Sequence, residues 1–173
     1  MNNSIGQKKK NWFLDKVCPM LLYFLNLLFI VSLFLIFLLS PVSYLRIANK
    51  DNQELFSKKN VSEFQITHIH SVAKSLVKDF YEIHDYSSII QNRMEYHDYG
   101  AGLPTAIDNG NFQIINETMV LSDLNYEFTE IRIMVGRYSD QKIVFTDEII
   151  TLSEIADPGQ LLILKPGMKF KVF

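Results

Sequence analysis

An uncharged apolar segment near the amino terminus constrains this chain more than any other feature. No charged residue occurs in 17–45, and the run MLLYFLNLLFIVSLFLIFLLS at 20–40 is interrupted only by Asn26 and Ser32. At a rise of about 1.5 Å per residue, a helix of this length spans roughly 32 Å, which matches a hydrocarbon core of about 30 Å. A helix is also the form that satisfies its own backbone in lipid. The run therefore predicts a membrane-spanning helix.

We predict that 17–45 is an uncleaved signal anchor that follows a basic tail at 1–16. The apolar region of a cleaved signal peptide is about 7–15 residues long, which is shorter than this run. Cys18 is the chain's single cysteine, and it precedes the run instead of following it as a lipid-modified cysteine would. An amide in hydrocarbon is costly without a partner, so Asn26 is a candidate contact with another membrane helix.

The flanking charges predict the orientation of this helix. Four Lys or Arg residues lie near each end of the run: Lys8, Lys9, Lys10 and Lys16 before it, and Arg46, Lys50, Lys58 and Lys59 after it. The lysines on the amino side lie closer to the run and are joined by the terminal amine. Because positive charge favours the cytoplasmic side, we expect a cytoplasmic amino terminus and an extracytoplasmic 46–173.

The composition after the run excludes one class of function. Residues 46–173 contain thirteen Lys and Arg against eighteen Asp and Glu, a net charge of −5, and no cysteine. Nucleic-acid binding uses a basic face to neutralise phosphates, so direct nucleic-acid binding is not expected. Without disulfides, an apolar core must hold this part together.

The chain after the membrane segment divides into a charged stalk at 46–60 and an α+β domain at 61–173. Apolar residues in VSEFQITHIHSVAKSLVKDFYEI (61–83) recur at helical spacing, and Ser62 with Gln65 forms a capping box at its start. A second capping box begins at Ser88 and predicts a second, shorter helix.

Residues from 111 onward are rich in β-branched and aromatic side chains, which favours strands. We predict four or five antiparallel strands, with a hairpin between 125–138 and 142–152. The expected domain is two helices packed on one face of a curved antiparallel sheet.

The stretch EIHDYSSIIQNRMEYHDYG (82–100) contains a His-Asp-Tyr pattern twice. His84, Asp85, His97 and Asp98 are therefore candidates for a pocket, provided that the fold brings the two pairs together. Adjacent residues point in different directions, so neither pair forms a catalytic dyad with itself. The favoured interpretation is that each pattern marks the end of a helix, where a histidine complements the helix dipole.

The remaining histidines, His68 and His70, do not share a face on the predicted helix, so they are not expected to chelate a metal together. We find no phosphate-binding loop, zinc-ligand spacing or nucleophile motif in the chain. The sequence therefore predicts no catalytic residue, no metal and no cofactor, and we expect a protein that is not an enzyme.

The layout resembles the VirB-eight-like scaffold subunits of conjugation and type IV secretion systems. The shared features are a short basic tail, one signal anchor, a stalk, the helical stretch SVAKSLVKDFYEIHDYSSIIQNRMEYH and a trailing antiparallel sheet. The resemblance implies a nuclear-transport-factor-like extracytoplasmic domain. It also implies a non-catalytic assembly protein that self-associates and contacts other membrane and envelope subunits of a transfer channel.

Two alternatives stay open at this stage. A nuclear-transport-factor-like cone can also bind a small molecule or act as an enzyme, and fold alone does not separate these functions. A pseudopilin-like subunit is the third hypothesis, but its processing site is absent, since Gly6 is followed by Gln-Lys-Lys.

Overall fold

A computed structural model describes residues 4–98 and 110–170, including the side chains of 19–98 and 110–170. The first element is the long helix α1 (Ser4–Leu38). Within the part of the chain that the structure describes, 19–38 is the helical stretch long and apolar enough to cross a membrane. Its apolar side chains are exposed, as for Tyr23 at 77%. An exposed apolar surface of this kind supports a membrane anchor.

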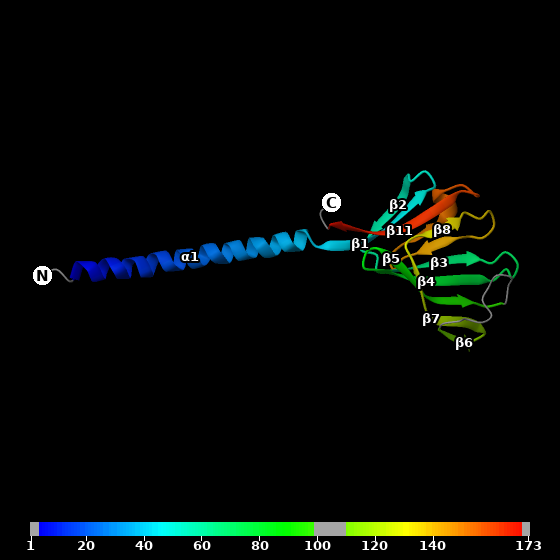
Figure 1. Cartoon of the computed structure of the whole chain (residues 1–173), viewed down its shortest axis with the longest axis horizontal. Coiled ribbons are helices and arrows are strands. Elements are labelled where there is room, and N and C mark those ends of the chain that lie inside the picture. The colour runs from blue at the N-terminus through cyan, green and yellow to red at the C-terminus, as the bar shows by residue number, and fades with distance from the viewer. Residues whose placement is uncertain (1–3, 99–109, 171–173) are drawn as a thin grey trace. The chain divides into compact units, whose positions relative to one another are not determined.

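The second compact unit, Pro41–Lys169, contains two sheets (Figure 1). The smaller sheet has the order β2 (Glu54–Lys59), β1 (Pro41–Asn49), β11 (Leu161–Phe170) and β8 (Ile131–Met134). The larger sheet has the order β10 (Ile149–Thr151), β9 (Lys142–Val144), β3 (Glu63–Ile69), β4 (Leu76–His84), β5 (Ser88–Tyr96), β7 (Thr118–Phe128) and β6 (Asn111–Ile115). A single-turn helix, α2 (Leu152–Ile155), follows β10.

The main core joins the two sheets. Alternate residues of a strand share a face, so β1 and β11 each present their apolar residues to one side. Those residues are buried in one cluster with side chains from β3, β4, β5 and β9, and its members include Leu45, Ile47, Phe64, Ile66, Tyr81, Ile89, Ile143, Leu162 and Leu164. A second cluster lies on β4, β5 and β7: Val77, Tyr96, Met119, Leu121 and Leu124.

Lys58 adds a polar connection between the sheets. It projects from β2 in the smaller sheet, and its Nζ lies 2.9 Å from carboxylate oxygens of both Asp147 and Glu148, between β9 and β10 of the larger sheet. The same ammonium lies 5.3 Å from the ring centroid of Phe145. The hydrogen bonds to the two carboxylates raise the pKa of Lys58.

The coarse class, an amino-terminal apolar helix followed by a sheet-rich domain, is confirmed. The two helices predicted over 61–83 and from Ser88 are wrong, because these residues form β3, β4 and β5. Asp79 and Gln91 occupy inward-facing positions, while Phe80 faces outward. Polar residues on the buried side and an aromatic residue on the exposed side concealed the alternation typical of strands.

The predicted stalk at 46–60 is also wrong as a structural description, because it contains β1 and β2. The domain begins earlier than expected, at Pro41. Leu45, which we assigned to the membrane segment, is fully buried in the domain core. The prediction extended the membrane segment too far because it relied on the lack of charge. A strand that is buried on one face can be as uncharged as a membrane segment.

The predicted hairpin between 125–138 and 142–152 does not form. Within these segments, β8 pairs with β11 of the smaller sheet, whereas β9 pairs with β3 and β10 of the larger sheet. The connection from β8 to β9 therefore passes from one sheet to the other.

The turn between β6 and β7 provides a test of the fold. Asn116 and Glu117 have φ values of 48° and 65°, and Ile115 pairs with Thr118 across them. Two positive φ values define a type I′ turn, at which Gly fits better than Glu. We expect Glu117→Gly to stabilise the protein by a few tenths to about 1 kcal/mol, because Gly relieves left-handed strain at a partly offsetting entropic cost. Thermal unfolding of the full-length protein in detergent would measure this change.

Glu127→Gly is the matched control. Glu127 lies within β7 and is not among the residues with positive φ. At this strand position the same substitution should destabilise the protein by about 0.5–1 kcal/mol, because Gly inside a strand loses more conformational entropy on folding. Equal destabilisation by both substitutions would contradict the turn.

Candidate functional site

A groove of about 620 Å³ lies on the face of the larger sheet that is opposite the core. Its floor is a row of directly paired residues that crosses five strands: Val144, Gln65, Phe80, Arg93 and Ser122. The other lining residues are Glu63, Asn92, Asp123 and Thr146, together with Phe64, Tyr81 and Phe145, which also belong to the main core cluster. The groove is therefore built from side chains that are far apart in sequence and adjacent in the sheet.

Irregular pairing occurs beside this groove. The register between β4 and β5, and that between β5 and β7, both shift around Asn92. On β7 the extra residues include Asp123 and Asn125, with φ values of 57° and 53°. Bulges of this kind bend a strand and increase its twist. The local bend accounts for the hollow in this sheet face, and it also turns Leu124 into the second core cluster.

Arg93 is held in place in the middle of the groove. Its guanidinium carbon lies 5.0 Å from the ring centroid of Phe80, a cation–π contact. The Arg93 guanidinium also contacts the carboxylate of Glu95, which is 3.7 Å from Nζ of Lys78. The Arg93 side chain is nevertheless 45% exposed. The site thus offers a pre-positioned guanidinium stacked on an aromatic ring.

The opposite face of the same strands contains a buried polar pair. Nε2 of Gln91 donates a hydrogen bond of 2.8 Å to Oδ1 of Asp79, and both side chains are buried. Burial raises the pKa of Asp79 to about 7, although the hydrogen bond from Gln91 opposes this shift. Burial also raises the pKa of the neighbouring Tyr81, and the Asp79 carboxylate adds to that effect. Asp79 is a titratable group in the protein interior and is not part of the groove.

The structure places the four predicted pocket residues at the two ends of β5. His84 and Asp85 lie at the turn between β4 and β5, and His84 Nε2 is 3.0 Å from Oδ2 of Asp85. His97 and Asp98 follow the other end of β5, where His97 Nε2 is 3.2 Å from Oγ1 of Thr118. All four residues are exposed. Nine residues of strand separate the two pairs by about 30 Å, so the structure does not bring them together.

The His-Asp-Tyr patterns mark strand ends, where we had expected helix ends. Asp85 and Tyr86 have φ values of 48° and 59°, which form the tight turn of the β4–β5 hairpin. The second tyrosine, Tyr99, lies outside the described residues.

The other candidates lie elsewhere. Asn26 is exposed on α1. His68 is on β3, and burial followed by the charge of His70 lowers its pKa. His70 lies just after β3, and its Nδ1 accepts a hydrogen bond of 3.1 Å from the backbone N–H of Ala73. Within residues 4–98 and 110–170, no group of three His, Cys, Asp or Glu side chains is placed to hold a metal ion.

Sequence reasoning missed the groove and the buried pair entirely. Phe80 and Arg93 are thirteen positions apart, and only the pairing of β4 with β5 places them together. A signal for Asp79 was present, because on a strand Asp79 shares a face with Val77 and Tyr81. The helical interpretation of 61–83 hid it.

The pKa of Asp79 leads to a pH-dependent stability. The folded protein holds a proton on this carboxyl up to about pH 7, whereas the unfolded chain loses it near pH 3.8. Stability from this group is therefore complete below pH 3.8 and is lost as the pH rises through about 7. Asp79→Asn keeps an oxygen acceptor for Gln91, and its amide cannot ionise. Between about pH 5 and pH 8, the thermal midpoint of this variant should therefore fall less than that of the wild-type protein.

Asp51→Asn, at an exposed loop position, is the control for this comparison. It should retain the pH dependence of the wild-type protein. If Asp79→Asn and Asp51→Asn show the same slope of midpoint against pH, Asp79 is not the titrating group.

Comparison with known proteins gives one match. Residues 64–152, which are 89 of the 173 residues, match the family described as a domain of unknown function, DUF1850. The matched region begins within β3 and ends after β10, so it includes most of the groove and the Asp79–Gln91 pair. No curated protein and no solved structure matches the chain. Because the match covers more than half of its length, the chain belongs to the DUF1850 family.

Proposed function

We propose that this chain is a non-catalytic, membrane-anchored scaffold subunit that binds another cell-envelope protein through the groove of its larger sheet. The observation that carries the proposal is the guanidinium of Arg93, held over the Phe80 ring and still 45% exposed. Arg and aromatic side chains dominate the energetics of many protein interfaces. A side chain that is already positioned loses little conformational entropy when a partner binds.

The form of the groove favours a segment of protein over a small molecule. Its floor is the outer face of a sheet, and its lining combines polar and charged residues with aromatic ones. Small-molecule sites commonly bury roughly 70–90% of the ligand's surface in a cleft that is mostly apolar. An extended segment could lie across the row from Gln65 to Ser122, with an apolar side chain against Phe80 and an acceptor toward Arg93.

The wider assembly is part of the same proposal. A VirB-eight-like role in a conjugation or secretion channel, with self-association and contacts to other subunits, stays a prediction from the layout of the sequence. The nuclear-transport-factor-like cone that the same resemblance implies also stays a prediction. The packing of two sheets gives that prediction no further support. The apolar helix α1 supports membrane anchorage.

A photocrosslinking amino acid at Ser122, on the groove floor, tests the proposed function in native membranes. We expect an adduct with another envelope protein. Arg93→Glu or Phe80→Ala should reduce its yield by about tenfold or more, because loss of a central interface residue costs roughly 2 kcal/mol or more.

Arg137→Glu provides the matched control, since Arg137 is exposed in the loop between β8 and β9. It should leave the yield unchanged. Equal yields in the Arg93→Glu and Arg137→Glu variants would exclude the groove as the binding site. A bound small molecule in place of a protein adduct would favour the ligand-binding alternative.

The proposed orientation has a separate test. Tyr138 is 86% exposed on the β domain. In a Cys18→Ser background, Tyr138→Cys should react with a membrane-impermeant maleimide in intact cells, whereas Asn2→Cys should react only after lysis. Labelling of Asn2→Cys alone in intact cells would reverse the orientation.

A further inference from the structure

The two sheets have four edge strands, and three of these are protected against pairing with another chain. An edge is commonly blocked by charged residues, by short length or by a covering segment. β2 contains Glu54, Lys58 and Lys59, while β8 has four residues and includes Arg132. β10 has three residues and leads directly into α2.

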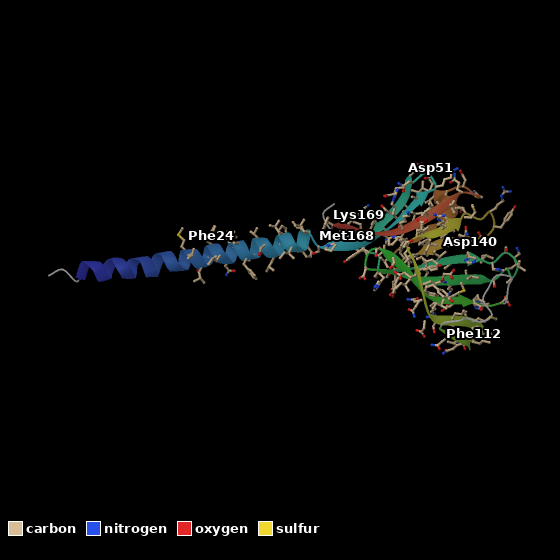
Figure 2. The ribbon with its side chains drawn as sticks, in the orientation of Figure 1. Phe24, Asp51, Phe112, Asp140, Met168 and Lys169 are labelled. Carbon is tan, nitrogen blue, oxygen red and sulfur yellow. The ribbon has the colours of Figure 1, made fainter. Side chains whose placement is uncertain are left out.

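Within residues 4–98 and 110–170, the fourth edge strand, β6, has none of these protections. Its five residues, NFQII, include no charge and no proline, and all five are exposed. Its pairing with β7 is regular, without a bulge. Figure 1 shows β6 at the edge of the larger sheet, on the side away from the smaller sheet, and Figure 2 marks Phe112 there. Ile114 is 61% exposed.

The backbone groups on the free side of β6 follow from its hairpin. Ile115 and Thr118 flank the two-residue turn, so they form a pair that exchanges hydrogen bonds within the hairpin. Because hydrogen-bonded and non-hydrogen-bonded pairs alternate, Gln113 and Asn111 also direct their backbone groups toward β7. The N–H and C=O groups of Phe112 and Ile114 therefore point away from β7, toward the free edge.

We propose that β6 pairs with β6 of a second copy of this chain, antiparallel and centred on Gln113. In this register Phe112 of each copy lies opposite Ile114 of the other. All four outward N–H groups of the two strands then find a C=O acceptor. Gln113 meets its own counterpart as a non-hydrogen-bonded pair.

The side chains favour the same arrangement. Phe112 and Ile114 lie on the face of Leu121 and Met119, their partners on β7, and both of those residues belong to the second core cluster. Pairing would place Phe112 against Ile114 across the new contact and extend this apolar face from one copy to the other. No like charges meet, because β6 has no charged residue. The lack of charge and the self-complementary pairing of Phe112 with Ile114 favour a second copy as the occupant of the edge.

The contact is small, which sets the conditions under which it can form. Two strands of five residues bury far less than the roughly 1,200 Å² of a stable interface. Anchoring both copies in one membrane raises their effective concentration and offsets this weakness. Pairing is therefore expected for the full chain in membranes, and the proposal specifies the self-association that the proposed function includes.

Cysteine crosslinking of the full-length protein in its native membrane tests the register. In a Cys18→Ser background, Gln113→Cys should form a disulfide-linked dimer under mild oxidation, because a non-hydrogen-bonded pair places the two Cα atoms about 4.5 Å apart. Asn111→Cys, on the same strand and face, should not, because its Cα and its counterpart would be separated by more than 10 Å. No dimer with Gln113→Cys, or equal dimer with Asn111→Cys, would overturn the proposal.

A second variant separates pairing from folding. Ile114→Pro removes an N–H that points outward, so the ladder between β6 and β7 keeps its bonds. In the Gln113→Cys background it should abolish the dimer with little change in thermal midpoint. A dimer that persists would contradict the pairing. Phe80→Ala in the same background should still yield the dimer, so failure of the groove and failure of the β6 contact are distinguishable.

Discussion

The apolar contact between the two sheets is the interaction on which the β domain depends. Leu45 and Leu164, near the two ends of the domain in sequence, are fully buried in one cluster with Ile143 of the larger sheet. The domain has no cysteine, so no disulfide can replace this contact. Because β1 lies beside β11 in the smaller sheet, the core forms only when the first and last strands come together. The Lys58 bridge to Asp147 and Glu148 adds to a packing that apolar burial has already produced.

The groove is a consequence of how the larger sheet meets that core. Alternate side chains of β4 and β5 point into the buried interior. The side chains between them point to the opposite face of the sheet, where they form a continuous row. The register shifts around Asn92 then bend the sheet locally. The same two strands therefore carry the buried Asp79–Gln91 pair on one face and the Phe80–Arg93 contact on the other. The internal carboxyl and the proposed binding surface are built on shared backbone.

Two kinds of contact follow from one fold. In the proposals made above, the groove presents side chains and would select a partner by their chemistry, whereas β6 presents backbone groups and would select a partner by strand register. In the proposed function, membrane anchorage through α1 would strengthen the weaker, backbone-based contact, because it would confine the copies to two dimensions. This division suits a scaffold that repeats itself in a membrane while holding a different protein.

The sequence by itself determined the features that depend on local composition. The apolar run at 20–40 predicts a helix because its length and lack of charge have one stable solution in lipid. The β-branched and aromatic residues from 111 onward likewise predicted strands in the second half of the chain. What the sequence could not determine was the structure of 61–98, where outward Phe80 and inward Asp79 imitate helical periodicity.

The tertiary structure alone decided which residues meet. The paired His-Asp motifs look like two halves of a site, yet β5 holds them at opposite ends, because a strand extends about 3.4 Å per residue. Phe80 and Arg93 carry no recognisable motif, and cross-strand register places them together. The exposed edge of β6 likewise exists only once the opposite edge of β6 has paired with β7. Spacing along a chain constrains contacts within an element, whereas contacts between strands are set by register, which the whole core determines.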